Sequence, residues 1–479
     1  MIETPTARLA FEDFGPAIPP RPAFGRWLAG TIAGWTAFVA FLLFISWLLL
    51  AIAALFARLG PIGAAVGNIV GLILILVMVT ATLLTMADRK WSALMQDRVG
   101  PNRARLSIIP GLRNRPLKGI PHVLADVLKM LFKEDFIPEG AMNNKVLFNL
   151  APLLAFAPAF MLFAIVPVSP EVTFLGQRIQ LQVARVDWGI LYVFALASLA
   201  VFATALAGWT SDNKLALLGG LRASAQLISY EVTLGLTLVG AFIAFGTLRL
   251  EEMARLQGML GPALRSAVVL AARAGDFLVR DDSVLFGWLP SWGFVYQPIG
   301  MILFLVAAQA EIKRAPFDTP EGESEIIGYF LEYSGLKSGL FLIAEYAETV
   351  VVAGIVTTIF LGGYHLPFIE PTVVRHFDFA WLSVFQVFAF IVKMLFIIWV
   401  MFVVRWAFPR FRYDQIMRLG WKMMLPISLF NVALTAGIFL WAGREGLAWM
   451  GGIEWLAIIA FVALSARAPR AEEAPHASH

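Results

Sequence analysis

The chain has 479 residues, of which 59% are hydrophobic and only 15% are charged, and this excludes a soluble fold, in which about 25% of residues are charged. The formal net charge of +4 and five histidines that all lie outside apolar segments exclude a nucleic-acid-binding surface and a membrane haem held by paired histidines. The chain has no cysteine, so a disulfide, a thiolate-bound iron–sulfur cluster and a cysteine zinc site are excluded as well.

Ten apolar segments are long enough to be membrane helices, because about 20 apolar residues span the hydrocarbon core. In chain order they are 28–57, 66–87, 146–168, 188–208, 226–247, 294–310, 338–363, 380–404, 424–442 and 447–465. The first is too long for a cleavable signal, and its leader 1–27 is polar and contains acids and prolines. The last contains Glu454 and several glycines, so it either crosses the membrane or lies on it. The sequence predicts an all-α polytopic membrane protein.

The distribution of basic residues predicts the orientation. If both termini are cytoplasmic, 26 of the 37 Lys and Arg residues lie in cytoplasmic segments and 10 in the opposite loops, while Lys393 lies inside a span. The positive-inside rule favours this arrangement. The cytoplasmic loops are then 88–145, 209–225, 311–337 and 405–422.

Within the first of these loops, apolar residues recur at helical spacing on one side and charged residues on the other. The apolar side holds Leu124, Val127, Leu128, Leu131 and Phe132, and the polar side holds Asp126, Lys129 and Lys133. This pattern predicts an amphipathic helix that lies in the membrane interface.

Besides Glu454, four charged residues lie within the predicted spans, where a charge costs about 2.5 to 3.5 kcal/mol near the bilayer centre. Glu231, Glu345 and Glu348 lie roughly 9 to 16 Å from the cytoplasmic ends of their helices, at about 1.5 Å per residue, and Lys393 lies roughly 18 Å deep. Glu345 and Glu348 share one helix face. Two interpretations remain open, a buried salt bridge between Lys393 and a glutamate and a relay of carboxylates that exchange protons.

The loop from Glu311 to Glu332 is acidic, with the sequence EIKRAPFDTPEGESEIIGYFLE. Its acids are Glu311, Asp318, Glu321, Glu323, Glu325 and Glu332, and its bases are Lys313 and Arg314. Two prolines prevent a regular helix, and alternate glutamates of an extended segment point to one side. The composition favours a segment that holds protons or responds to a charge change at a nearby ligand; the alternative is a solvated charged loop. The spacing of a Ca²⁺-binding EF-hand loop is absent.

Five long segments carry a family resemblance. They are MQDRVGPNR at 95–103, LADVLKMLFKEDFIP at 124–138, GWTSDNKLALLGGLRASAQLISYE at 208–231, AEIKRAPFDTPEGESEIIGYFLEYSGLKSGLFLIAEYAE at 310–348 and RWAFPRFRYDQIMRLGW at 405–421. In these segments the chain resembles the H-type subunits of NADH-quinone oxidoreductases, the quinone-channel membrane subunits of respiratory complex I. None of the segments combines a nucleophile with a base or a metal-ligand set.

The resemblance implies an eight-helix core bundle at 66–442, to which the helix at 28–57 and the C-terminal extension 443–479 are additions. It implies an integral protein of the bacterial inner membrane that contacts lipid, the soluble quinone-site and iron–sulfur subunits, and the antiporter-like membrane subunits. Quinone is the implied substrate, while FMN and iron–sulfur clusters belong to partner subunits. No catalytic or metal-binding residue is implied in this chain, which would contribute to proton translocation without redox chemistry.

The resemblance also implies two groups of site residues. The positions around the quinone cavity and channel are Arg89, Arg98, Asp126, Glu134, Arg222, Asp318, Glu321, Glu323, Glu325 and Glu332. Glu231, Glu311 and Glu345 match the acidic path that leads away from that cavity, and the depth argument adds Glu348 and Lys393. The chain departs from the family pattern at Asp88, where glutamate is usual, at Lys313, where a neutral polar residue is common, and in the longer, more basic segment 104–120.

Three other interpretations fit parts of the pattern. The homologous membrane subunit of a proton-pumping membrane-bound hydrogenase would share the core loops without needing a quinone. An independent proton-coupled transporter would also have intramembrane Glu and Lys residues, although the sequence shows no internal repeat. An inert membrane anchor would leave the buried charges unexplained.

Overall fold

A computed structural model describes residues 24–102, 104, 119–257, 292–322, 328–366 and 380–467. The predicted cavity residues Glu323 and Glu325 lie outside the described residues, as do most of the segment 104–120 and of the loop 248–293. Everything below concerns the described part of the chain.

The described chain is built almost entirely of helices. Their order is α1 (Phe24–Ala57), α2 (Pro61–Asn68), the π-helix η2 (Ile69–Met78), α3 (Val79–Met95), α4 (Pro121–Phe132), the 3₁₀ turn η5 (Glu139–Asn144), α5 (Lys145–Met161), η6 (Leu162–Ile165), α6 (Gly189–Thr210), α7 (Lys214–Phe245), α8 (Leu250–Leu256), α10 (Gly293–Tyr296), α11 (Pro298–Glu311), α12 (Gly335–Phe360), α14 (Ala380–Ala407), α15 (Tyr413–Arg418), η7 (Leu419–Met424) and α16 (Leu425–Arg467). Two short antiparallel strands, β1 (Val172–Phe174) and β2 (Gln177–Ile179), form a hairpin between η6 and α6, with Thr173 opposite Arg178.

Eight stretches within the described residues are long and apolar enough to cross a membrane. They coincide with eight of the ten predicted spans, which confirms an all-α polytopic membrane protein. The other two predicted spans, 294–310 and 447–465, match the shorter apolar helices Pro298–Glu311 and Trp449–Ser465. The first of these is short because Gln297 leaves helical geometry and Pro298 then starts α11, separating it from α10.

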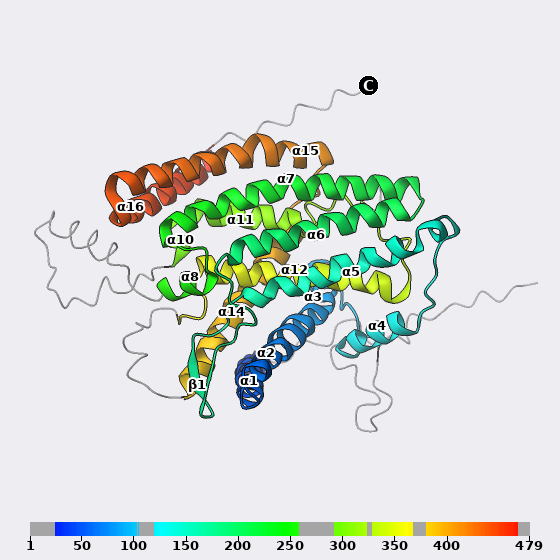
Figure 1. Ribbon diagram of the computed structural model, residues 1–479, viewed down its shortest axis with the longest axis horizontal. Helices are drawn as coiled ribbons and strands as arrows, with labels where there is room; N and C mark the ends of the chain where they lie inside the picture. The colour runs from blue at the N-terminus through cyan, green and yellow to red at the C-terminus, as the bar shows by residue number, and fades with distance from the viewer. Residues whose placement is uncertain are drawn as a thin grey trace, which may run out of the picture.

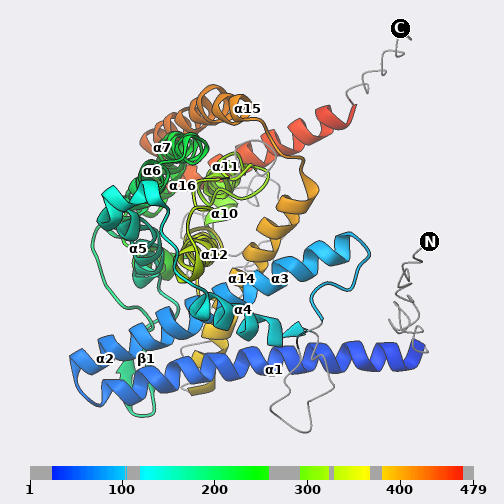
Figure 2. The same cartoon turned by 90° about the vertical axis from the view of Figure 1, so that its right-hand side faces the viewer.

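Helix α12 is the centre of the bundle and is the most buried of the membrane-spanning helices. It packs against α5, α3 and α14, while α6, α7 and α11 continue the bundle on one side and α16 covers α7 and α11. Figure 1 shows α5, α6 and α7 running alongside one another with α16 beyond them. Figure 2 shows the hairpin of α1 and α2 on the other side of the molecule, where α1 also contacts α14.

Several helices extend beyond the limits expected from hydropathy. α3 continues to Met95, α7 begins at Lys214, α14 continues to Ala407, and α15 lies inside the predicted loop 405–422. The expected loop 209–225 therefore reduces to a short turn, in which the Asn213 side chain accepts a hydrogen bond from the Leu215 N–H and caps α7. Hydropathy marks only the residues inside the hydrocarbon, and these helices project beyond it.

The amphipathic segment forms α4, as predicted, and it packs against α12 and α3. Its apolar residues remain exposed, and Phe132 is 85% exposed, as expected for a helix in contact with lipid. The chain after α4 lies against the start of α12, where Gly335 has φ +58 and a Cβ would lie 3.0 Å from the Lys133 carbonyl oxygen. The ion pair between Lys337 and Asp135, at 2.8 Å, joins the same two segments.

Candidate charge cluster and cavities

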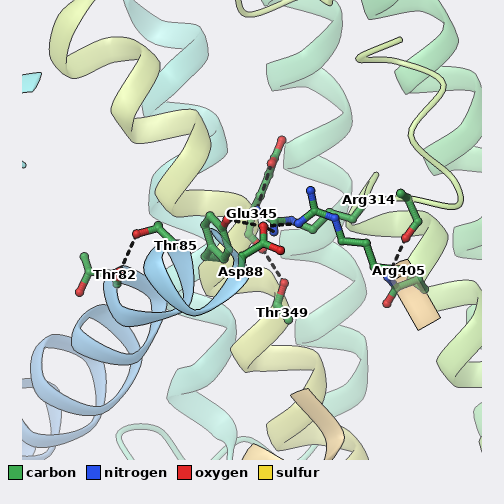
Figure 3. Close-up of polar contacts among 10 residues, drawn as sticks. Thr82, Thr85, Asp88, Arg314, Glu345, Thr349 and Arg405 are labelled. Atoms are coloured by element: carbon green, nitrogen blue, oxygen red, sulfur yellow. Dashed lines mark hydrogen bonds and ion pairs between the residues drawn. The ribbon is translucent and has the colours of Figure 1, made fainter. Parts of the chain in front are cut away.

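Four charged side chains from different parts of the sequence meet near one end of the bundle. Asp88 of α3 pairs with Arg405 of α14, and the Nη1 atom of Arg314 lies 3.5 Å from Asp88 Oδ2. The Nη2 atom of Arg314 lies 3.7 Å from Glu345 Oε2 on α12. Figure 3 shows Arg314 and Arg405 pointing toward Asp88 from the side opposite α3. Two carboxylates and two guanidinium groups make this cluster electrically neutral.

Tyr346 completes the cluster. Its hydroxyl donates a hydrogen bond of 2.9 Å to Asp88 Oδ2, and its ring lies 3.6 Å from the guanidinium carbon of Arg314. Stacking on an aromatic ring suits a buried guanidinium better than it suits an ammonium, because the guanidinium is planar and weakly hydrated. Asp88, which the sequence marked as a departure from the family, thus contacts a tyrosine and two arginines through Oδ2, while its buried Oδ1 has no hydrogen-bond partner among the described residues.

The loop after α11 turns sharply and so directs Arg314 into the bundle. Lys313 has φ +61, a left-handed conformation. Gln226 of α7 fixes both sides of this turn, because its Nε2 donates to the carbonyl oxygens of Ala310 at 2.7 Å and Phe317 at 3.0 Å. The Thr319 hydroxyl donates a hydrogen bond to the side-chain oxygen of Gln226, Oε1. Sequence reasoning did not identify Gln226, which has no spacing relation to this loop.

Two cavities adjoin the cluster, and Arg405 lines both of them. The α3 cavity, of about 370 Å³, is lined by Asp88, Arg89, Ser92, Arg98, Gly100, Pro101, Arg405 and Trp406. The α12 cavity, of about 270 Å³, is lined by Arg314, Ala315, Asp318, Glu321, Phe330, Ser338, Phe341, Leu342, Glu345, Tyr346 and Arg405. Arg405 therefore borders both cavities, and its partner Asp88 lines the α3 cavity.

The structure brings four of the predicted cavity residues to these cavities, namely Arg89, Arg98, Asp318 and Glu321. Arg89 also forms a 2.6 Å ion pair with Asp126, which ties α4 to α3.

The structure does not bring the other predicted cavity residues that it describes, Glu134, Arg222 and Glu332, to either cavity. Glu332 accepts a 2.6 Å hydrogen bond from the Asn213 side chain. Arg222 lies over the Tyr413 ring at 5.7 Å. Glu134 is exposed beyond the end of α4.

Burial and neighbouring charges shift the pKa values of two side chains in the acidic loop, Glu321 and Lys313, as is suitable for a charge-sensitive site. Burial raises the pKa of the Glu321 carboxyl, and the nearby carboxylates of Glu345 and Asp318 raise it further. Burial by itself lowers the pKa of the Lys313 ammonium, but Tyr329 and surrounding glutamates outweigh this effect and leave that pKa raised. Lys313 is 4% exposed, so the loop holds a buried ammonium group near a carboxyl group whose pKa is raised.

The raised pKa of Glu321 predicts that the stability of the folded protein depends on pH. Because Glu321 binds its proton more tightly in the folded protein than in the unfolded chain, folding loses stability as the pH rises above the ordinary carboxyl value of 4.5 toward the raised value. We expect Glu321→Gln to remove this loss, so that its unfolding temperature exceeds that of the wild type by an amount that grows as the pH rises above that ordinary value. Thermal unfolding of the purified protein across this range measures it, and a difference that stays constant with pH would contradict it.

The glutamates predicted to form an acidic path continue from the cluster into the membrane. Glu348 lies one turn beyond Glu345 on α12, and together with Glu311 it lines a narrow, mostly apolar cavity between α5, α6, α7, α11 and α12. Glu231 of α7 accepts a 2.7 Å hydrogen bond from the Ser198 hydroxyl. The four carboxyl groups thus occupy three neighbouring helices.

The structure does not bring Lys393 to these glutamates. Its ammonium donates to the carbonyl oxygens of Leu361, Gly363 and His365, at 2.8, 3.0 and 2.5 Å, and lies 4.2 Å from the centre of the Trp292 ring. These carbonyls follow the end of α12, thirteen residues or about 20 Å beyond Glu348. Lys393 therefore caps the end of α12 that lies opposite the charge cluster.

The fold and this site define a class of protein, a polytopic helical membrane protein with a buried charge cluster and two cavities beside it. Residues 67–436 match the family described as NADH dehydrogenase. An H-type subunit of NADH-quinone oxidoreductase from Geobacter sulfurreducens is 40% identical over 376 residues, which are 78% of this chain and 96% of that protein. The H-type subunit of NADH-quinone oxidoreductase from Thermomicrobium roseum is 38% identical over 381 residues, with 78% and 96% covered.

The chain belongs to this family, which confirms the resemblance carried by the five sequence segments. It is an integral, multi-pass protein of the bacterial inner membrane. The family match begins after α1 and ends within α16, so α1 and the last part of α16 lie outside the matched residues. Among the residues that the structure describes, no group of three or more His, Asp or Glu side chains is placed to hold a metal ion.

Proposed function

We propose that this chain is the membrane subunit of a proton-translocating NADH:quinone oxidoreductase, in which it forms the quinone access channel. The observation that carries the proposal is that Arg405, the partner of Asp88, lines both the α3 cavity and the α12 cavity. The relatives named above are subunits of NADH-quinone oxidoreductases. The other subunits of such a complex would be the partners, and they would hold FMN and the iron–sulfur clusters.

The surroundings of the α3 cavity suit a quinone, which joins an apolar tail to a head with two carbonyl oxygens. Exposed apolar side chains of α4, such as Leu131 and Phe132, provide a lipid-facing surface for the tail. Arg89 and Arg98 in the cavity supply donors for carbonyl or phenolate oxygens. Asp126 holds Arg89 in place through their ion pair.

The remaining predicted residues fit the cytoplasmic side of this channel. Asp318 and Glu321 line the α12 cavity. Glu134, Arg222 and Glu332, with Glu323 and Glu325 assigned from sequence alone, are proposed to face the quinone cavity and the soluble subunits around it.

The charge cluster is proposed to couple quinone reduction to the membrane. Reduction of a quinone adds electrons and draws protons, which changes the charge next to Asp88 and Arg405. Arg314 contacts both Asp88 and Glu345. A weaker electrostatic interaction of Arg314 with one carboxylate therefore strengthens its interaction with the other. Glu345 then takes up or releases a proton, and Glu348, Glu311 and Glu231 pass that change toward the antiporter-like subunits.

The test is quinone reduction by the detergent-solubilised complex that copurifies with a tagged copy of this chain. We expect inhibitor-sensitive electron transfer from NADH to quinone, and we expect Arg98→Gln to raise the KM for quinone by about tenfold, since a hydrogen bond to a charged group contributes about 1.5 to 3 kcal/mol. Arg178→Gln is the matched control, because Arg178 is exposed on β2 outside both cavities.

Three outcomes would contradict the proposal. Hydrogenase activity without NADH oxidation would favour the membrane subunit of a hydrogenase. A tagged chain that purifies alone and transports protons would favour an independent transporter. An unchanged KM in Arg98→Gln would remove the α3 cavity from the quinone channel.

A further inference from the structure

The second half of α16 folds back against the break between α10 and α11. Gly443, with φ 62 and ψ −152, interrupts α16, and the chain beyond it returns to α10. The approach is close, since a Cβ on Gly451 would lie 2.2 Å from the Val295 carbonyl oxygen. This half of α16 follows residue 436, where the family match ends.

The returning helix brings the carboxyl group of Glu454 to the first turn of α11. Glu454 is 1% exposed, and its Oε2 atom accepts a 2.8 Å hydrogen bond from the Ile299 N–H. Pro298 and Ile299 are the first two residues of α11. A side chain that accepts from the second or third N–H of a helix performs the function of an N-cap. Here that side chain comes from a residue 155 positions away in the sequence.

The residue in the N-cap position of α11 cannot perform this function. The side chain of Gln297 donates to the Thr435 hydroxyl at 2.8 Å and accepts from the Asn431 amide at 3.1 Å. Both partners belong to the first half of α16. With Gln297 engaged there and little water inside a bilayer to hydrogen-bond a free backbone N–H, the first turn of α11 needs an acceptor from elsewhere.

We propose that Glu454 is a positioning residue that holds α11, and through it Glu311, in register with the other glutamates of the acidic path. α11 has 14 residues, about 21 Å at 1.5 Å per residue, and Glu311 is its last residue. A short helix held at its first turn transmits that constraint to its other end. The functional part of this inference rests on the proposed function, since it assumes that Glu311 carries protons.

The acceptor oxygen, rather than the negative charge, is the feature that the cap needs. The other oxygen of Glu454, Oε1, is buried and makes no hydrogen bond within the described chain. A glutamine at this position keeps one carbonyl oxygen for the Ile299 N–H, whereas a leucine of similar size keeps none. The two substitutions therefore separate a cap from a residue that must exchange a proton.

The experiment compares Glu454→Gln, Glu454→Leu and the exposed-site control Glu171→Gln in the assembled complex reconstituted in lipid. Hydrogen exchange of the peptide that covers 293–304 reports the first turn of α11, and the ratio of protons pumped to electrons transferred reports Glu311. We expect Glu454→Leu to speed exchange by about tenfold, as the loss of one hydrogen bond predicts, and to lower the pumping ratio. Glu454→Gln and Glu171→Gln should match the wild type.

Unchanged exchange in Glu454→Leu would overturn the cap. A Glu454→Gln variant as impaired as Glu454→Leu would also overturn it, because the carboxyl group itself would then be required. The variant Glu311→Gln separates this inference from the proposed function. Normal pumping in that variant would overturn the proton path, whereas faster exchange in Glu454→Leu would still support the cap.

Discussion

Arg314→Met is expected to destabilise the protein more than any other single substitution in the charge cluster. Arg314 is the cation that contacts both Asp88 and Glu345, and its side chain is only 10% exposed. Methionine keeps much of the side-chain volume but leaves two buried carboxylates with Arg405 as the remaining arginine of the cluster. Removing one partner of a buried ion pair costs about 3 to 5 kcal/mol. We expect a lower unfolding temperature and poor assembly, measured by thermal unfolding of the purified protein.

The matched control is Arg255→Met. Arg255 also pairs with a glutamate, Glu252 at 2.5 Å, but its side chain is 66% exposed. An exposed pair contributes about 0 to 1 kcal/mol, so this variant should unfold near the wild-type temperature. Equal decreases in unfolding temperature in the two variants would show that the cluster does not depend on Arg314.

The cluster also shows the limit of what the sequence predicts. Periodicity and hydropathy locate the membrane helices and α4, because these depend on residues near one another in the chain. The depth of Glu345 and Glu348 on one face of α12 follows from the same local geometry. Asp88 and Arg405 are more than 300 residues apart, and no spacing in the sequence indicates that they meet. The contacts of Gln226 and Glu454 could not be predicted from the sequence for the same reason, since each residue contacts a distant segment.

Lys393 illustrates the opposite error, because its predicted depth in the membrane was taken to indicate contact with the glutamates. Its distance from the cytoplasmic end of α14 is compatible with several neighbours, and the sequence argument considered only glutamates. In the structure three backbone carbonyls saturate its ammonium group. Carbonyl partners cannot be foreseen from side-chain patterns, because every residue carries one. Lys393 of α14 thus caps the last turn of α12, whereas Glu345 and Glu348 lie in the first half and middle of α12.

Glu348→Gln is expected to uncouple proton pumping from quinone reduction. Glu348 lines the narrow cavity that Glu311 also lines, and it lies one turn from Glu345, so the proposed path from the cluster toward Glu311 includes this position. Glutamine preserves the size of the side chain but cannot exchange a proton. Substitutions along a coupling network change the coupling by about 0.5 to 2 kcal/mol, which corresponds to a decrease in pumping of about two- to thirtyfold.

The measurement is proton translocation and NADH oxidation in vesicles that contain the same amount of assembled complex. Glu139→Gln serves as the control, because Glu139 is exposed at the start of η5, outside the acidic path. We expect the ratio of protons to electrons to fall in Glu348→Gln and to stay unchanged in Glu139→Gln, while electron transfer continues in both. A normal ratio in Glu348→Gln would remove this residue from the path. Parallel losses of pumping and electron transfer would instead place Glu348 in the quinone site, because a relay beyond the cluster acts only after the quinone has reacted.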